Sequence, residues 1–495
     1  MEQQDELFQL IKALSKSEKK FFTQYVNLYE KGSSPIYLQV FEFLNTEESY
    51  NEERLFQKFR RDLNFRKNYA VTKHYLKNLI IKTLRHGELT VREDRDLTVY
   101  ILDVKRLMAK GLFGMAKKLI EKLKEEANTE EKLMDAVNLI AMQRGLISMG
   151  YYRNEPEVNL DALDEEEEAL FEKIKQLREV MNFSIKLYGL MNHEMLANPE
   201  EAMKAIEALG KKKALKKFEE LGTAKAKHTF LNFWTLYYCA TGDYKKYLEF
   251  ANKKLHFVKH EKIPPTVSNW LILAYNHCLS ASLLTGDFSE IEARLSFLEG
   301  MELQSQFHDS DRFTTVSIFG LLYAIAENNE KKIRHYIDYS NEGLHRLSPF
   351  IRRTFSYTLR SIVSYAYLKL KDYDKCLVEV NDLMALTNGE VRKDYVGHVK
   401  IINLMLRYEM KEYQFLSYLL KNTYRFFMHY LYTSPVHNFV VAYMKEAMKS
   451  KDEKKLRALN EVYLSKLHAL RYHPTEADLA LVMMMEDHLK TTEAK

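Results

Sequence analysis

The sequence contains few of the residues that end helices, and this shortage limits the fold class. Its 495 residues include only 16 glycines and 8 prolines, too few turn-forming residues for an all-β chain. Leucine, lysine, glutamate, alanine and methionine, which all favour helices, are abundant. The sequence therefore predicts an all-α protein, and its length favours an array of helical units over a single hydrophobic core.

Cysteine is also scarce, and the common signatures of catalytic and metal sites are missing. The three cysteines, Cys239, Cys278 and Cys376, are far apart in the sequence, so we expect reduced, buried side chains. The chain has no CxxC or HExxH motif, which argues against a structural zinc site or a metalloprotease site. It also has no GxGxxG, GxxxxGK[ST] or GxSxG motif. We therefore expect no catalytic residues, no cofactor and no metal, as in a non-enzymatic protein.

Long hydrophobic runs are missing as well. The longest apolar run, Ile318 to Ala326, is far shorter than the roughly 20 residues that span a bilayer. The first six residues are polar and acidic, unlike the basic start of a signal peptide. We therefore expect a cytoplasmic protein with no membrane partner.

Six short segments of similar composition recur between stretches of helical periodicity, and each predicts a turn inside a helical hairpin. They are Gly111-Leu112-Phe113, Gly242-Asp243-Tyr244, Gly286-Asp287-Phe288, Asn329-Glu330, Lys371-Asp372-Tyr373 and Lys411-Glu412-Tyr413. We use the last residue of each segment as its mark. From the mark at Tyr244, the next four marks follow at intervals of 44, 42, 43 and 40 residues, and a weaker segment, Lys451-Asp452-Glu453, follows 40 residues later. This period predicts an array of helix pairs, with each helix about 26 Å long.

The same step, extended backwards, sets the limits of the array. The 131 residues between Phe113 and Tyr244 divide into three steps of about 44, which predicts turns near 157 and 200. Asn154-Glu155-Pro156 and Asn198-Pro199-Glu200 lie at these places. We therefore assign residues 91–470 to the repeats and 471–495 to a C-terminal capping helix and tail, with the helix covering the final pair.

Two of the turn segments, Gly242-Asp243-Tyr244 and Lys371-Asp372-Tyr373-Asp374-Lys375-Cys376-Leu377, resemble the tetratricopeptide-repeat (TPR) family. The resemblance is to a divergent member, because the usual period of that family is about 34 residues. It implies a TPR-like, right-handed α-solenoid of antiparallel helix pairs that serves as a scaffold for protein–protein interaction.

Residues 1–90 do not follow the repeat, and we assign them to a small helical N-terminal domain. Its segment 54–86 holds ten basic residues against a single acid, Asp62, whereas the rest of the chain carries a net charge of about −4. The basic residues are Arg54, Lys58, Arg60, Arg61, Arg66, Lys67, Lys73, Lys77, Lys82 and Arg85. The basic residues suit contact with phosphates, and the aromatic rings between them suit stacking on bases. A basic stripe of this kind is more often simply a solvated face of a helix. The periodicity places Lys73 and Lys77 on the outward face.

The predicted function is that of a scaffold or adaptor that binds a protein or peptide in the groove of the solenoid. Groove-facing residues of the first helix in each pair would make the contacts. The candidates for these contacts are Asn232, Tyr237, Asn269, Tyr275, Asn276, Tyr357 and Arg360. Two alternatives stay open: an adaptor that binds nucleic acid or ribonucleoprotein through the basic segment, and a signalling regulator that responds to a peptide. The oligomeric state is not indicated.

Overall fold

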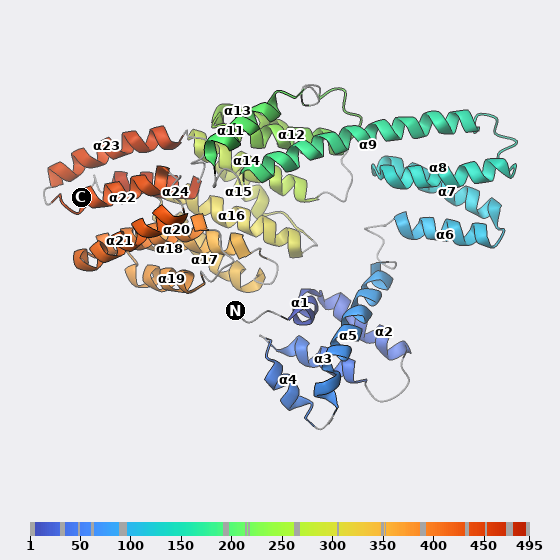
Figure 1. Cartoon of the computed structure of the whole chain (residues 1–495), viewed down its shortest axis with the longest axis horizontal. Helices are drawn as coiled ribbons and strands as arrows, with labels where there is room; N and C mark the ends of the chain where they lie inside the picture. Colours follow the sequence, from blue (N-terminus) through green and yellow to red (C-terminus); the bar gives the residue numbers. More distant parts are fainter. Residues whose placement is uncertain are drawn as a thin grey trace. The chain divides into compact units, whose positions relative to one another are not determined.

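The structure is a computed structural model, and it describes most of the chain. The described residues are 5–29, 35–47, 50–60, 64–88, 97–191, 198–212, 215, 218–261, 268–303, 306–347, 351, 353–386, 393–430, 435–450, 453–471 and 479–491. They form 23 helices and no strand, which confirms the all-α prediction for this part of the chain (Figure 1).

The chain divides into two compact units, of which the first comprises Met1–Glu125 and Ser148–Tyr151. The helices that begin in it are α1 (Glu6–Ala13), α2 (Lys16–Tyr29), α3 (Ile36–Thr46), α4 (Glu52–Lys58), α5 (Phe65–Glu88), α6 (Leu97–Ala109) and α7 (Phe113–Thr129). Helices α1 to α5 share one hydrophobic core, whose buried members lie between Leu7 and Ile80. The unit therefore includes α6 and most of α7 in addition to the segment 1–90.

The second unit comprises Glu126–Ile147 and Tyr152–Lys495. Its helices are α8 (Leu133–Ser148), α9 (Leu160–Gly189), α11 (Pro199–Gly210), α12 (Ala224–Ala240), α13 (Tyr244–His260), α14 (Ser268–Thr285), α15 (Ile291–Glu299), α16 (Gln306–Ala326), α17 (Glu330–Leu347), α18 (Arg353–Lys369), α19 (Tyr373–Ala385), α20 (Lys393–Glu409), α21 (Tyr413–Tyr430), α22 (Pro435–Ala447), α23 (Glu453–Arg471) and α24 (Leu479–Thr491). Several have 17 or 18 residues, as the repeat step predicts.

Each of the six predicted turns contains, or directly follows, a residue in the left-handed backbone region. These residues are Gly111, Gly242, Gly286, Asn328, Lys371 and Lys411, with φ between 55° and 76°. After Lys371, the N–H of Asp372 donates to the carbonyl of Tyr367, a helix-closing bond that spans five residues. The Asp372 side chain then caps α19 by accepting from the N–H of Lys375. Backbone geometry therefore ends one helix and starts the next. Of the weaker mark at Lys451-Asp452-Glu453, the first two residues lie outside the described residues.

The segment between the first two marks departs from the regular step. The chain does leave the helical conformation near 157, between α8 and α9, and Asn198 immediately precedes α11. Between these breaks, however, α9 runs without interruption for 30 residues. No glycine or proline occurs between Pro156 and Gly189 to divide it. The stretch therefore forms one long helix in place of a helix pair.

The later helices pack in consecutive pairs. The first helices of successive pairs also contact one another, α14 on α16, α16 on α18, α18 on α20 and α20 on α22. We call these five helices the even-helix row. Most of their buried apolar side chains belong to one core that extends to Leu489.

Helix α24 packs more widely than the predicted cap over the final pair. It contacts α23, but it also contacts α14 and α16, which precede it in the chain by about 150 to 200 residues. In Figure 1, α24 lies beside helices of the even-helix row. This helix therefore covers the row as well as the last pair.

Candidate functional site

Helix α24 is buried on every side along its central part. The five consecutive residues from Leu481 to Met485 are each at most 7% exposed. Five residues exceed one turn of an α-helix, so their side chains point in all directions from its axis. A helix that is buried all round is enclosed by its neighbours. The surfaces of the even-helix row and of α23 that face α24 thus form a groove, which we call the α24 groove.

A charged pair anchors α24 to α18. Nζ of Lys369 donates to Oδ1 of Asp487 at 2.5 Å, and the two side chains are only 9% and 12% exposed. The hydroxyl of Tyr365 lies 2.8 Å from Oδ2 of Asp487 and 2.8 Å from the carbonyl oxygen of Met484. Burial, and then the carboxylate of Asp487, raise the pKa of Tyr365 well above its ordinary value, so this hydroxyl stays a donor.

Helices α22 and α23 hold the other end of α24. The side-chain amide of Asn460 donates to the carbonyl of Leu489 at 3.3 Å, and it is held in turn by the hydroxyl of Tyr443 at 3.0 Å. The ring of His488 lies edge-on to Tyr443 and to Tyr408 of α20. Polar contacts from α18 and α23, together with ring contacts from α20 and α22, therefore fix the position of α24.

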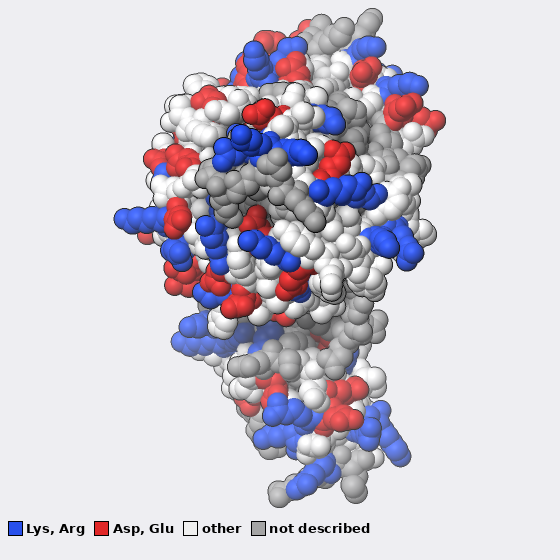
Figure 2. Space-filling view, turned by 90° about the vertical axis from the view of Figure 1, so that its left-hand side faces the viewer, with Lys and Arg blue, Asp and Glu red and all other residues white. Residues whose placement is uncertain are grey.

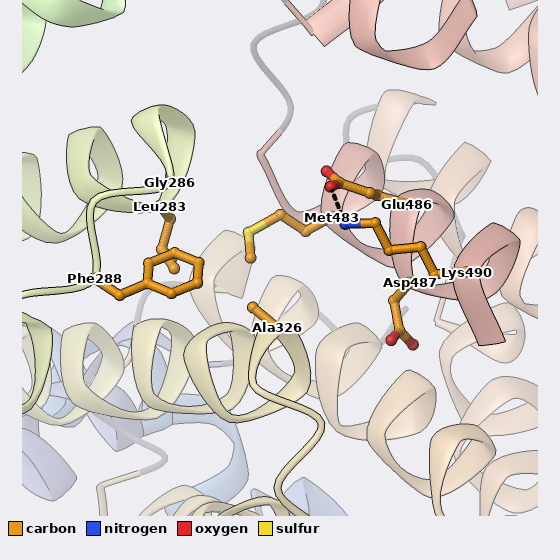
Figure 3. A pocket seen from close by; sticks show the side chains of 8 residues that line it. All are labelled: Leu283, Gly286, Phe288, Ala326, Met483, Glu486, Asp487 and Lys490. Carbon is orange, nitrogen blue, oxygen red and sulfur yellow. Dashed lines mark hydrogen bonds and ion pairs between the residues drawn. The ribbon is translucent and has the colours of Figure 1, made fainter. Parts of the chain in front are cut away.

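Packing is looser where α24 meets the ends of α14 and α16. A cavity of about 260 Å³ lies there, lined by Leu283, Gly286, Phe288, Ala326, Met483, Glu486, Asp487 and Lys490. Figure 3 shows the Met483 side chain extending from α24 toward Phe288 and Ala326, with the Glu486–Lys490 ion pair beside it. One wall of the cavity is thus apolar, and the other carries charged groups of α24.

The seven residues predicted to line a groove take several different places. Asn269 is exposed, and Asn276 donates to Thr315 of α16 at 3.4 Å. Tyr237 lies beside Gly210 and Trp234. These contacts describe the side chains in the absence of a partner, so the set stays a prediction.

Three of the seven make contacts within their own hairpin. Tyr275 is 2% exposed, and its ring stacks on Phe297 of α15. The Tyr357 hydroxyl donates to the carbonyl of Leu383, and Arg360 pairs with carboxylates of α19. The contacts that hold α24 come instead from Tyr365 and Lys369, one and two turns further along α18.

Asn232, the remaining candidate, is part of a buried polar cluster between α12, α13 and α14. Its Oδ1 accepts a hydrogen bond from Nζ of Lys254 at 2.6 Å. Lys254 is fully buried, and this burial lowers its pKa to about 7. Burial also lowers the pKa of His228 and His277 nearby. The two histidines are therefore uncharged at neutral pH, Lys254 is partly deprotonated there, and the cluster belongs to the interior.

The basic segment of the first unit is partly neutralised by acidic residues of α1. Lys73 pairs with Asp5, which caps α1, and Lys77 pairs with Glu6 at 2.6 Å and lowers the pKa of Glu6. The side chains of Lys73 and Lys77 stay 34% and 40% exposed, so both lie on the outward face of α5, as the sequence pattern predicts, while they pair with α1.

Other basic side chains of the segment are also engaged. Arg54 pairs with Glu47, and Arg66 lies over the ring of Phe56. Among the remaining described residues, Lys58, Arg60, Lys67, Lys82 and Arg85 are exposed, and Arg61 lies outside the described residues. On the face shown in Figure 2, basic and acidic side chains are interspersed.

Comparisons of the chain with protein-family models, with curated proteins and with solved structures found no match. Within the described ranges, no group of three or more His, Cys, Asp and Glu side chains is placed to hold a metal ion. None of the helices in the described part combines the length and apolar composition that crossing a bilayer requires. All three cysteines are free thiols, and Cys278 and Cys376 are buried.

The sequence analysis missed the residues that hold α24. It assigned the helix to a terminal cap over the final pair and named none of Tyr365, Lys369 and Asp487. A signal was present, because five consecutive apolar residues leave no polar side over more than a full turn, which is typical of a helix enclosed by protein. The pattern indicates enclosure but does not name the enclosing helices.

Proposed function

We propose that this protein is a non-enzymatic scaffold or adaptor that binds a helical segment of a partner protein in the α24 groove. In this proposal the consecutive helix pairs form a TPR-like, right-handed solenoid, and the even-helix row lines its inner surface. The observation that carries the proposal is the enclosure of α24. The row already binds a helix through apolar burial and through the pair between Asp487 and Lys369.

The chemistry of the α24 groove favours a protein partner over nucleic acid. Its walls are largely apolar, and its charged anchor is a nearly buried cation–carboxylate pair. Binding of a helix to such a surface depends on apolar burial, which salt does not weaken. Nucleic-acid binding would instead fall steeply as salt rises.

The test compares the proteins that stay bound to the purified full chain at low and high salt, with and without nuclease treatment. We expect retained proteins to survive both high salt and nuclease. Phe288→Glu, which places a charge on the apolar wall of the cavity, should release them. The matched control is Tyr418→Glu on α21, where the native side chain is 61% exposed. That variant should retain the same proteins.

Two results would contradict the proposal. One is the loss of every retained protein on nuclease treatment, which would support the nucleic-acid alternative. The other is equal retention by the Phe288→Glu and Tyr418→Glu chains. Circular dichroism on both variants establishes that the helical content is unchanged, so that a loss of binding reports on the surface.

A further inference from the structure

We propose that α24 is an internal ligand that a partner helix displaces, and that this partner carries a carboxylate at the position of Asp487 and a large aromatic side chain at the position of Met483. The inference rests on the proposed function, because it names the partner and the regulation of the same groove. Two observations carry it: the anchor at Lys369 and the cavity beside Met483.

The anchor defines the charge that any occupant must bring. Lys369 is 9% exposed and is bonded to a carboxylate that comes from another part of the chain. If α24 leaves, Lys369 and Tyr365 lose this carboxylate, and a partner helix that takes the place of α24 covers both side chains again. An unpaired buried cation is unfavourable, so a replacement helix without a carboxylate at this position would bind poorly. The groove therefore selects an apolar helix with an acidic residue in one register.

The cavity shows that α24 does not fill its groove. A pocket of about 260 Å³ that is partly open to solvent lies beside the Met483 side chain, between α24 and the ends of α14 and α16. A void of ~150 Å³ already accommodates a benzene ring in a protein interior. A phenylalanine or tryptophan in place of Met483 would therefore gain apolar contact with Leu283, Phe288 and Ala326. A partner helix with such a residue fits the groove better than α24 does.

The composition of α24 is consistent with an occupant that exchanges. Three of its buried residues are methionines at 483, 484 and 485, whose flexible side chains adapt to different surroundings. Because α24 is covalently attached, it competes at a high effective concentration, on the order of millimolar for a short linker. A separate partner must therefore bind more tightly than α24. The added affinity comes from a large side chain that fills the cavity.

The test uses fluorescent peptides that span residues 477–493 and the full chain, either wild type or Asp487→Lys. Binding is measured by fluorescence anisotropy. A peptide with Met483→Trp should bind the Asp487→Lys chain at least about tenfold more tightly than the wild-type chain, because the internal helix has lost its anchor and competes less. The matched control peptide carries Met485→Trp. Met485 is fully buried and does not line the cavity, so that peptide should bind more weakly.

A charge exchange tests the register of the carboxylate. A peptide that combines Met483→Trp with Asp487→Lys should not bind the Asp487→Lys chain, in which Lys369 is retained. It should bind a chain that carries Lys369→Asp alone, because the lysine of the peptide then meets a carboxylate, whereas the internal Asp487 faces a like charge and competes less. If this exchanged pair does not restore binding, the assigned role of the carboxylate is wrong. If the Met485→Trp peptide binds as tightly as the Met483→Trp peptide, the role of the cavity is wrong.

Hydrogen exchange on the unmodified chain tests displacement without any variant. Amides of α24 should exchange in an opening that leaves α14 and α16 protected. Exchange of α24 only together with those helices would overturn the displacement. Equal peptide affinity for the wild-type and Asp487→Lys chains would overturn it too, while leaving the groove as a helix-binding surface. Failure of every peptide to bind an Asp487→Lys chain whose α24 amides exchange freely would overturn the proposed function as well.

Discussion

The carboxylate of Asp487 lies 2.5 Å from Nζ of Lys369, although 118 residues separate them in the sequence. Both side chains are nearly enclosed, so the pair links α24 to α18 in a place that water reaches poorly. Exposed ion pairs add little to stability, whereas breaking a buried pair leaves an uncompensated charge.

Lys369→Met should therefore destabilise the second unit by about 3 kcal/mol, because the carboxylate of Asp487 loses its cation. Adding Asp487→Leu should recover most of this loss, since neither charge then remains. Urea denaturation of the single and double variants measures both effects. The matched control is Lys490→Met, which removes an exposed partner of Glu486 and should change stability by less than about 0.5 kcal/mol. Equal effects of Lys369→Met and Lys490→Met would contradict the prediction.

The lowered pKa of Lys254 predicts that the free energy of unfolding depends on pH. Its pKa is about 7 in the folded chain, against an ordinary value of 10.5. Between these two pH values the unfolded chain binds a proton that the folded chain does not, so stability should rise with pH across this window and level off below it. Lys254→Met should flatten this rise and stabilise the fold at pH 7 by on the order of 2 kcal/mol. Urea denaturation at pH 7, 8.5 and 10 measures the slope.

The neighbouring Lys253 gives the control for that experiment. It is exposed and pairs with Glu249, one turn earlier on the same helix. Lys253→Met should leave the dependence on pH unchanged. A slope that persists in the Lys254→Met variant would show that another group titrates.

The left-handed turns offer a stability test in which no side-chain contact is involved. Lys371 has a φ of 60°, a conformation that costs a residue with a Cβ more than it costs glycine. Lys371→Gly should therefore stabilise the array by about 0.5–1 kcal/mol. Gly286→Ala is the reverse change at an equivalent turn, where φ is 76° and space around the new Cβ is open, and it should destabilise by a similar amount. Thermal unfolding of both variants measures the pair of effects, and shifts of the same sign would contradict the assignment.

The first unit should respond differently to charge reversal at two sets of lysines. Lys73→Glu sets a carboxylate against Asp5, which caps α1, and should destabilise this unit. Lys67→Glu changes an exposed residue on the same helix and should leave the melting temperature unchanged. Nucleic-acid binding is therefore tested better at Lys67, Lys82 and Arg85 than at Lys73. We expect reversal of those three charges to leave copurification with nucleic acid unchanged.

The sequence predicted the parts of this fold that depend on local chemistry. A turn residue followed by an N-cap, as at Lys371 and Asp372, ends one helix and starts the next without help from distant residues. The repeat step and the length of most paired helices followed from these turns. The expected break near 157 was also found, but the step did not foresee α9, where a long amphipathic run contains nothing to interrupt it.

The sequence holds less information on which side of each helix faces a groove and on which distant helices pack together. Both depend on where helices far apart in the sequence lie in the fold. Tyr357 and Arg360, which the sequence analysis places in a groove, contact α19 of the same hairpin in the absence of a partner, and their role in binding stays a prediction. The helices of the even-helix row are buried on more than one side, so periodicity alone does not tell which side meets a partner. Nothing in the local sequence around Asp487 identifies Lys369 as its partner.

The position of α24 in the chain sets an order of events during synthesis. Helices α14 to α22 leave the ribosome before α24, and their contacts are mostly between neighbours in sequence, so they can fold as they emerge. The part of the groove that the even-helix row supplies is therefore present before α24 has been made. A partner helix of the kind that we propose would meet no internal competitor in this interval, so its complex would form fastest while the protein is still being translated.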